Sequence, residues 1–308
     1  MTVQHEIPVV FDCRGDTLVG MVHRPGVAKT RGLLSIVAGG PQYRVGVGRL
    51  QVQLARSLAA DGIPVMRFDH RGLGDSEGGF RGFQDVADDL GAALQAFRRE
   101  APEVREFVLW GGCDAGSAVL INAWRFPEVS GIITGNPWVH SPETANAAVV
   151  RHHYRKRLHD KDFWLKLLRL QYNPLPALGV IGKAAVQRLG LARGAAAIDD
   201  ELAFNQDPSM PFVPRMRIGL SRFRGDLLMM MSGRSILVKE FDDLVATRPA
   251  WQAAMQAPRH VVRHDMPDAD QTYSSMASRR EVIEVMRRWM HDPRAPLQDA
   301  RPAAACGT

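Results

Sequence analysis

The chain has 308 residues, of which 45% are hydrophobic and 23% charged, and its formal net charge is +6. This is ordinary globular composition with ample apolar content for a sizeable core. No apolar stretch reaches the length needed to span a bilayer, and no nucleic-acid motif accompanies the positive charge. We therefore expect neither a membrane span nor a nucleic-acid partner. The charge is compatible with an acidic small molecule or an acidic carrier protein.

Cysteine is sparse, with only Cys13, Cys113 and Cys306. An odd, low count argues against a disulfide framework and fits a reducing compartment. The first ten residues lack the basic and apolar segments of a signal peptide. These features predict a cytoplasmic protein.

The first half of the chain alternates between strand and helix patterns. Strands are expected at 7–13 and 16–25, joined by a turn at Arg14 and Gly15. The continuous apolar runs beginning at residues 31, 63, 106 and 129 predict strands buried on both faces. Helical spacing separates them at 50–62, 83–100 and 116–127. This alternation predicts a mostly parallel sheet with helices on both faces.

The alternation breaks after residue 137 and resumes near residue 224. Between these points the sequence predicts helices, at 148–172 and 176–191, and loops. Strands at 226–233 and 260–267 then alternate with helices at 239–256 and 279–292. We expect a core at 1–137 and 224–292, a helical cap insertion at 138–223 and a disordered tail at 293–308.

The segment "FVLWGGCDAGSA", residues 107–118, joins a buried strand to a helix through small residues. In a nucleophile elbow, the nucleophile occupies the sharp turn between strand and helix, with small residues two positions away on either side. Gly111 and Ala115 flank Cys113 in this way. A shifted register would instead make Asp114 the nucleophile, between Gly112 and Gly116. We favour Cys113 because the strand places the first glycine at Gly111.

The loop after the first buried strand, "VAGGPQYRVG", is expected to form part of the same site. In this architecture such a loop supplies one backbone N–H of an oxyanion hole, and the residue after the nucleophile supplies the other. The expected donors are the N–H groups of Gly40 and Asp114. Gln42, Tyr43 and Arg44 then stand near the mouth as substrate-binding candidates. Arg44 fits two roles equally, binding an anionic group or pairing with a nearby acid.

The turn "FDHRGLGDSEG", residues 68–78, follows the next strand. We interpret Asp69, Arg71 and Asp75 as structural residues that tie this loop together. His70 is then a turn residue and not a catalytic base.

The chain resembles the α/β-hydrolases from about residue 10 to residue 290, and among them the hydrolases associated with the exosortase A system. The segments that carry the resemblance are "GGPQYRVG", "RFDHRGLGDSEG", "WGGCDAGSA", "NPWV" and "SGR…KEFDDL". In that group too a cysteine fills the elbow. The resemblance implies an α/β-hydrolase fold, with a mostly parallel sheet flanked by helices and a helical cap.

The resemblance also implies an aspartate and a histidine that complete a catalytic triad, and this sequence has neither. Ser235 stands at the aspartate position, in "SGRS", and Gln271 at the histidine position, in "ADQTY". A triad needs a group that takes the proton of the nucleophile and returns it to the leaving group. Glutamine cannot do this near neutral pH, so the triad is degenerate.

A thiol needs less activation than a hydroxyl, and the helix N-terminus at Cys113 is expected to favour the thiolate. A thioester on Cys113 could therefore form unaided, whereas its hydrolysis would need an activated water. His140 and His264 are the spatially plausible substitutes for the missing histidine. Both fit structural or surface roles better, and we include His140 among the substrate-binding candidates. The basic segment 151–170 fits a solvated helix face better than a lid for a CoA- or phosphopantetheine-bound acyl group.

We predict acyl transfer, or thioester or ester cleavage, through Cys113, with Gln271 and Ser235 completing the degenerate catalytic set. The substrate is expected to be a small acyl compound, free or bound to CoA or a carrier protein, with no cofactor and no metal. Two alternatives remain open. One is a non-catalytic binding protein, and the other is a non-hydrolytic enzyme of the cyclase or lyase type that uses only the pocket and oxyanion hole. The sequence does not indicate an oligomeric state.

Overall fold

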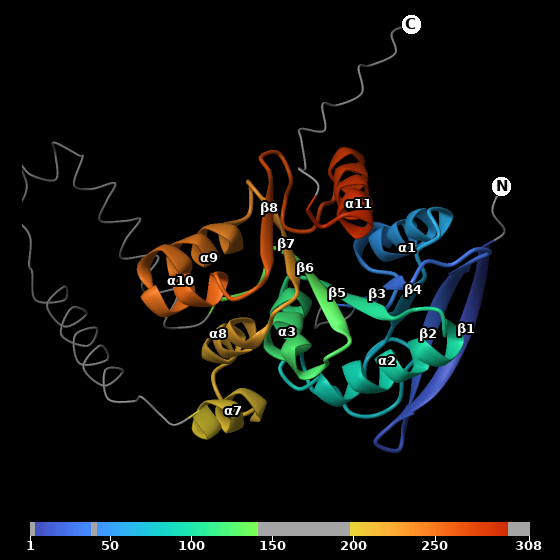
Figure 1. Ribbon diagram of the computed structural model, residues 1–308, viewed down its shortest axis with the longest axis horizontal. Helices are drawn as coiled ribbons and strands as arrows, with labels where there is room; N and C mark the ends of the chain where they lie inside the picture. The colour runs from blue at the N-terminus through green and yellow to red at the C-terminus, as the bar shows by residue number, and fades with distance from the viewer. Residues whose placement is uncertain (1–3, 38–41, 141–197, 295–308) are drawn as a thin grey trace, which may run out of the picture.

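A computed structural model describes residues 4–37, 42–140 and 198–294 (Figure 1). The strands are β1 Gln4–Cys13, β2 Asp16–Pro25, β3 Arg31–Ile36, β4 Val65–Phe68, β5 Glu106–Gly112, β6 Val129–Gly135, β7 Asp226–Ser232 and β8 His260–Met266. The helices are η1 Val47–Arg49, α1 Leu50–Ala60, α2 Ala87–Glu100, α3 Asp114–Asn122, η2 Ala123–Arg125, α7 Ile198–Gln206, α8 Phe212–Arg222, α9 Ile236–Thr247, α10 Pro249–Met255 and α11 Met276–His291. None of these helices has the length and apolar character that a bilayer crossing requires.

The strands form one eight-stranded sheet in the order β1-β2-β4-β3-β5-β6-β7-β8. The β1–β2 hairpin is antiparallel and adds to β4 in antiparallel fashion, while β4, β3, β5, β6, β7 and β8 run parallel to their neighbours. The predicted turn at Arg14 and Gly15 is present, and both residues have positive φ angles. This sheet with its flanking helices confirms the predicted fold class.

Helices cover both faces of the sheet because the central strands are apolar on both sides. In β5, Phe107 and Leu109 pack into one core, and Val108 and Trp110 into the other. The first core is closed by α2, α3, α8, α9 and α10, and the second by α1 and α11 (Figure 1). Continuous burial of this kind is expected for strands of a doubly covered parallel sheet.

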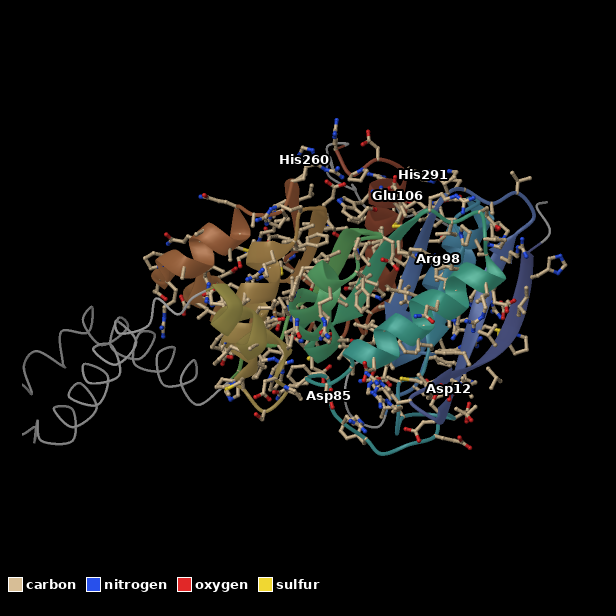
Figure 2. All side chains as sticks on the ribbon, turned by 60° about the horizontal axis from the view of Figure 1, so that its bottom comes forward. Asp12, Asp85, Arg98, Glu106, His260 and His291 are labelled. Atoms are coloured by element: carbon tan, nitrogen blue, oxygen red, sulfur yellow. The ribbon has the colours of Figure 1, made fainter. Side chains whose placement is uncertain are left out.

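Parallel strands give the sheet two chemically different edges. Glu106 and His260, at the starts of β5 and β8, lie at the top of Figure 2, and Asp12 and Asp85 lie at the bottom. The lower side is therefore the carboxyl edge, where the loops after β3, β4, β5, β6, β7 and β8 meet. Sites in open parallel sheets form at this edge, and it also contains the bend at Cys113.

The prediction of one continuous helix at 239–256 is wrong, since this segment forms two separate helices, α9 and α10. Pro249 begins α10, and Arg248 before it is extended, with φ −119° and ψ 106°. A residue before proline is pushed out of helical geometry, so the chain breaks here. The helices expected at 148–172 and 176–191, the basic segment 151–170 and residues 295–308 lie outside the described residues.

Helices α7 and α8 lie in the segment for which the sequence predicts a cap insertion. Helix α8 packs directly against α3, where Gly219 lies so close to Leu120 and Ile121 that an added Cβ would come within 2.3 Å of the Leu120 carbonyl oxygen. Of the 138–223 segment, the structure describes residues 138–140 and 198–223, and the latter contain α7 and α8. Its boundaries as an insertion stay a prediction.

His23 in β2 is buried beside Arg67 of β4. The Nε–H of Arg67 donates to Nε2 of His23 over 2.9 Å, an arrangement that requires an unprotonated nitrogen. Burial first, and the Arg67 charge second, lower the pKa of His23 to about 4. The histidine is therefore neutral in the folded protein at any pH above that value.

We predict that His23 makes the protein sensitive to acid. Its pKa is lower folded than unfolded, so its contribution to stability is complete above about pH 6.5 and is lost as the pH falls towards 4. The shift corresponds to about 3 kcal/mol. Urea unfolding across this pH range should show a smaller loss for His23→Gln than for the unmodified chain. His5→Gln, at an exposed position, should retain the full loss. An unchanged pH slope in His23→Gln would contradict this assignment.

Candidate active site

The chain bends sharply where β5 passes into α3, and Cys113 occupies the bend. Its backbone has φ 57° and ψ −123°, a conformation that side chains rarely adopt. Gly111 allows the bend, since a Cβ there would lie 2.3 Å from the Ala115 carbonyl oxygen. Gly116 is equally confined, at 2.4 Å from Oγ1 of Thr134. The predicted strand–turn–helix geometry is thus present, with small residues where close approach demands them.

Backbone hydrogen bonds hold this bend in place. The N–H of Cys113 donates to the Gly135 carbonyl over 2.7 Å, and the N–H of Trp138 donates to the Cys113 carbonyl over 3.1 Å. Asp114 is already the first residue of α3, and its carboxylate accepts from the Ala115 N–H. The bend therefore falls on Cys113 and not on Asp114, the alternative register.

The electrostatic surroundings of the Cys113 thiol differ from expectation. Burial first, and the Asp114 carboxylate second, raise the pKa of Cys113, while the Asp114 N–H and the Gln271 amide act in the opposite direction. The N–H at the helix N-terminus favours the thiolate, as expected, but the net effect of the surroundings is to raise the pKa of Cys113. A carboxylate in the first turn of α3 and loss of solvation outweigh the N–H groups.

Gln271 and Ser235 come together at this site from different loops. The hydroxyl of Ser235 donates to Oε1 of Gln271 and also accepts from the Leu237 N–H as the N-cap of α9. Nε2 of Gln271 is buried and makes no hydrogen bond to the described residues. The Gln271 amide is nevertheless close enough to the Cys113 thiol to lower its pKa. The three residues thus form a chain of neighbours, in the order that the resemblance implies.

The loop that carries Gln271 is fixed by its own side chains. Asp270 accepts from the hydroxyl of Ser274 and from the N–H groups of Ser274 and Thr272. The Ser274 hydroxyl first, and then these N–H groups and the Thr272 hydroxyl, lower the pKa of Asp270 to about 2. The phenol of Tyr273 is buried and donates to the Met230 carbonyl over 2.9 Å, and burial raises its pKa. A loop tied at both ends holds Gln271 in one position.

Two residues of this network were missed by sequence reasoning. Asn136, directly after β6, donates to Ser232 and to the Gln271 carbonyl, and Ser232 donates to the Asp270 carbonyl. An asparagine before a proline at the end of a strand signals a turn. It does not reveal partners about a hundred residues further along the chain.

Gly40, the other expected oxyanion donor, lies outside the described residues. Gln42, Tyr43 and Arg44 follow at the carboxyl edge, where Arg44 forms ion pairs with Asp69 and with Asp75, at 2.7 Å for the latter. Of the two roles that the sequence allowed for Arg44, the structure shows the pairing with acids. Tyr43 is exposed and lies beside the Arg44 guanidinium.

The turn after β4 has the structural character expected for it. Asp69 accepts from the N–H groups of Arg44 and Asp75. Arg71 is buried and pairs with Asp89 of α2 at 2.8 Å. His70 is buried in this turn, and burial lowers its pKa. These contacts fix the loop against α2.

The two histidines considered as substitutes are both paired with acids. Nδ1 of His140 lies 3.0 Å from Glu240 of α9, and His140 is half-exposed. Nε2 of His264 lies 2.8 Å from Glu281 of α11. Within the described ranges, histidine, cysteine and carboxylate side chains do not gather in groups of three that could hold a metal ion.

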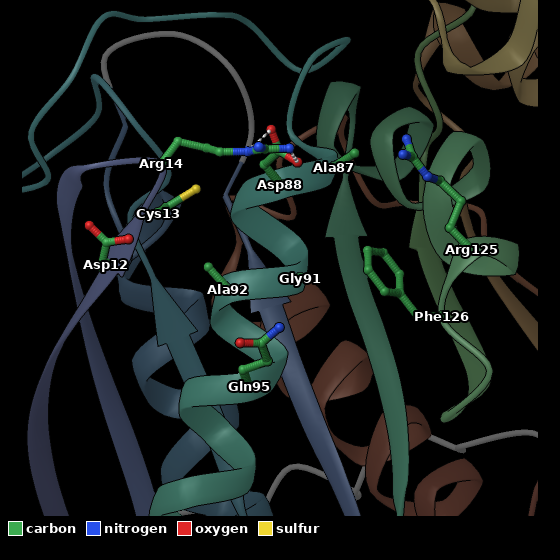
Figure 3. Close-up of a pocket in the computed structure, with 10 residues that line it drawn as sticks. All are labelled: Asp12, Cys13, Arg14, Ala87, Asp88, Gly91, Ala92, Gln95, Arg125 and Phe126. Atoms are coloured by element: carbon green, nitrogen blue, oxygen red, sulfur yellow. Dashed lines mark hydrogen bonds and ion pairs between the residues drawn. The ribbon is translucent and has the colours of Figure 1, made fainter. Parts of the chain in front are cut away.

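Two cavities open at the carboxyl edge. One of about 430 Å³ lies beside the bend and is lined by Asp114, Pro208 and residues 80–85. The other, of about 370 Å³, contains Cys13 and lies between the β1–β2 turn and α2 (Figure 3). Arg14 and Asp88, both among the residues that line this second cavity, form an ion pair (Figure 3). Cys13 is 3% exposed, and burial raises its pKa to about 11.

Comparison with known protein families gives one match, to Hydrolase_4, described as serine aminopeptidase, S33, over residues 29–221. The match covers more than half of the chain. The chain belongs to the Hydrolase_4 family. The description of the family names a serine enzyme, whereas this Hydrolase_4 chain has Cys113 at the bend. No curated protein matches the chain in sequence.

Solved structures with the same fold include several esterases. The Pyrococcus furiosus esterase Pf2001 is 13% identical, with a TM-score of 0.58, and the match covers 93% of this chain and 94% of that one. Est1E from Butyrivibrio proteoclasticus, solved with bound ferulic acid, is 15% identical, with a TM-score of 0.57 and coverage of 92% and 98%. DcsB, solved with a substrate analogue, is 14% identical, with a TM-score of 0.56 and coverage of 93% and 98%. At these identities the likeness establishes the α/β-hydrolase fold.

We predict that iodoacetamide modifies Cys113 before Cys13. Both thiols have raised pKa values, but Cys13 is buried whereas Cys113 is only partly buried. Reaction requires access as well as thiolate. Mass spectrometry of partly labelled protein distinguishes the two peptides. Earlier labelling of Cys13 would mean that Cys113 is not accessible from the site.

Proposed function

We propose that this Hydrolase_4 protein transfers an acyl group, or cleaves a thioester or ester, through a covalent intermediate on Cys113. The observation that carries the proposal is the position of Cys113 at a strained bend, with Gln271 and Ser235 opposite it. Backbone strain at a single polar residue is typical of functional sites. The cavity beside Asp114 offers space for a small substrate.

In the proposed first step, the Cys113 sulfur, as thiolate, forms a bond to the acyl carbonyl carbon. The carbonyl oxygen becomes an oxyanion, which the N–H groups of Asp114 and Gly40 stabilise. The bond to the leaving group then breaks, and the alcohol or thiol leaves with the electron pair and a proton from water. In the second step the nitrogen or sulfur of an acceptor forms a bond to the acyl carbon, the bond from that carbon to the Cys113 sulfur breaks, the sulfur leaves as thiolate, and the proton of the acceptor passes to water.

Gln271 supplies a hydrogen-bond donor in this scheme and not a base. Its amide favours the thiolate of Cys113. Ser235 holds this amide by donating one hydrogen bond to Oε1 of Gln271, and it carries no charge itself. Water, a poor nucleophile without a base, reacts slowly with the thioester. An amine or a thiol needs less help, so transfer to such an acceptor is favoured over hydrolysis.

The expected acyl donor is a small molecule, free or bound to CoA or a carrier protein, because the net charge of +6 favours acidic partners. The sparse cysteines support a cytoplasmic location for this proposed reaction. We also propose that this chain is one of the hydrolases associated with the exosortase A system, because it shares with them segments such as "GGPQYRVG" and "WGGCDAGSA".

A second candidate is a binding protein, or an enzyme of the cyclase or lyase type, that retains the pocket without acyl chemistry. The raised pKa of Cys113 favours this candidate, because little thiolate exists near neutral pH. The next two experiments separate the candidates.

We expect p-nitrophenyl acetate to give a burst of product equal to the enzyme concentration, followed by slow turnover. The burst rate should rise about tenfold per pH unit through neutral pH, since the raised pKa keeps the thiol protonated there. Stopped-flow absorbance measures both phases. Cys13→Ala should keep the burst and Cys113→Ala should abolish it. A burst that survives Cys113→Ala would exclude this mechanism.

We expect the double variant Gln271→His, Ser235→Asp to gain ester hydrolysis. The two side chains already touch, and aspartate caps a helix as well as serine. General-base assistance contributes about a hundred- to ten-thousand-fold, measured as steady-state turnover of the same ester. Gln271→His alone should gain less, because its imidazole lacks an orienting acid.

Thr272→His is the matched control, since it places an imidazole one residue away at an exposed position. It should gain nothing. A folded double variant without any gain would show that the site does not hold triad geometry, and would favour the second candidate.

A further inference from the structure

Asn136 is buried between the ends of β6 and β7 and the loop that follows β8. It is 1% exposed and directly follows β6. Its Nδ2 donates to Oγ of Ser232 over 2.8 Å and to the Gln271 carbonyl over 3.0 Å, and its Oδ1 accepts from the Ser232 N–H over 2.8 Å. One carboxamide therefore joins the ends of β6 and β7 to the loop that follows β8.

Ser232 extends this connection to the residue before Gln271. Its hydroxyl, fully buried, donates to the Asp270 carbonyl over 2.9 Å. The carbonyls of Asp270 and Gln271 are thus both held by buried donors. Buried hydrogen bonds of this kind are costly to break, because the freed groups have no water to replace their partners. The backbone on which the Gln271 side chain stands has little freedom.

The backbone of Asn136 does not require an asparagine. Its φ is 47°, in the left-handed region that glycine adopts most easily and asparagine tolerates. The main-chain N–H bonds to the Met230 carbonyl, which any residue except proline could do. The carboxamide is therefore the property that distinguishes asparagine from glycine at this position.

We propose that Asn136 is a positioning residue that fixes the Gln271 loop so that the Gln271 amide reaches the Cys113 thiol. It touches neither the sulfur nor the substrate in this scheme and acts only through Gln271. The inference rests on the role proposed above for Gln271. Its consequence is that the reactivity of Cys113 depends on a side chain at the end of a neighbouring strand.

The test measures the alkylation rate of Cys113 by iodoacetamide across neutral and alkaline pH. The midpoint of this profile reports the thiol pKa and, unlike the plateau, does not depend on access to the sulfur. The charged group that influences the thiol is Asp114, which stays in place in every variant, and the Tyr273 phenol beside it is neutral because burial raises its pKa. Asn136→Gly keeps the backbone conformation and removes the carboxamide.

We expect Asn136→Gly to move the midpoint upward by about half to one pH unit, a three- to tenfold loss of thiolate. Gln271→Ala should move it in the same direction. In the Gln271→Ala background, Asn136→Gly should then add nothing, since its effect passes through the missing amide. Ser232→Ala, a smaller change, should give a smaller upward shift and serves if Asn136→Gly does not fold.

Asn205→Ala is the matched control, because Asn205 is equally buried but joins α7 to α8. It should lower stability without moving the midpoint. An unmoved midpoint in both Asn136→Gly and Ser232→Ala, or shifts that add fully to that of Gln271→Ala, would overturn the inference. The burst experiment is independent of these profiles. If the unmodified chain gave no burst but the variants showed the expected midpoint shifts, the acyl chemistry would be refuted and the positioning role of Asn136 would stand.

Discussion

The reversal of the chain at Cys113 is the constraint on which the rest of the site depends. A strand that enters the centre of a parallel sheet must leave it as a helix within one residue, and the backbone at Cys113 does this at φ 57°. Such a conformation persists only where its surroundings determine it fully. Gly111 and Gly116 provide the space, and the hydrogen bond to the Gly135 carbonyl provides the attachment.

That attachment links the bend to β6, and β6 leads to the loops opposite. Asn136 lies one residue beyond Gly135, so the strand that anchors the cysteine also carries the carboxamide that holds the Gln271 loop. The bend at Cys113 and the Gln271 loop are therefore both hydrogen-bonded to the end of β6. A site assembled from several loops becomes rigid when those loops share one support of this kind.

The chemical character of the site follows from replacing ionisable groups by neutral ones. A serine hydroxyl and a glutamine amide occupy positions where the resemblance implies a carboxylate and an imidazole. Neither titrates near neutral pH, so the remaining ionisable groups at the bend are the thiol and its neighbour Asp114. In this setting burial and one like charge decide the protonation of the sulfur.

The fold and the centre of the site were predictable because their signals are local. Continuous apolar runs marked the buried strands, and small residues around Cys113 marked the bend. Ser235 and Gln271 were found from flanking residues. The separation of α9 from α10 was also encoded locally, by Pro249, and was missed. The hydrogen bonds of Asn136 and the ion pairs of Arg44 depend on partners that only the folded chain brings near. The pKa of Cys113 depends on packing in the same way.

The protonated state of the Cys113 thiol has a consequence for its chemical durability. Peroxide oxidises cysteine through the thiolate, so oxidation to sulfenic acid slows as the proton is held more tightly. A bend residue with a raised pKa therefore resists the damage to which low-pKa catalytic cysteines are prone. Cys13 is buried, and burial raises its pKa to about 11, so it is protected in the same manner.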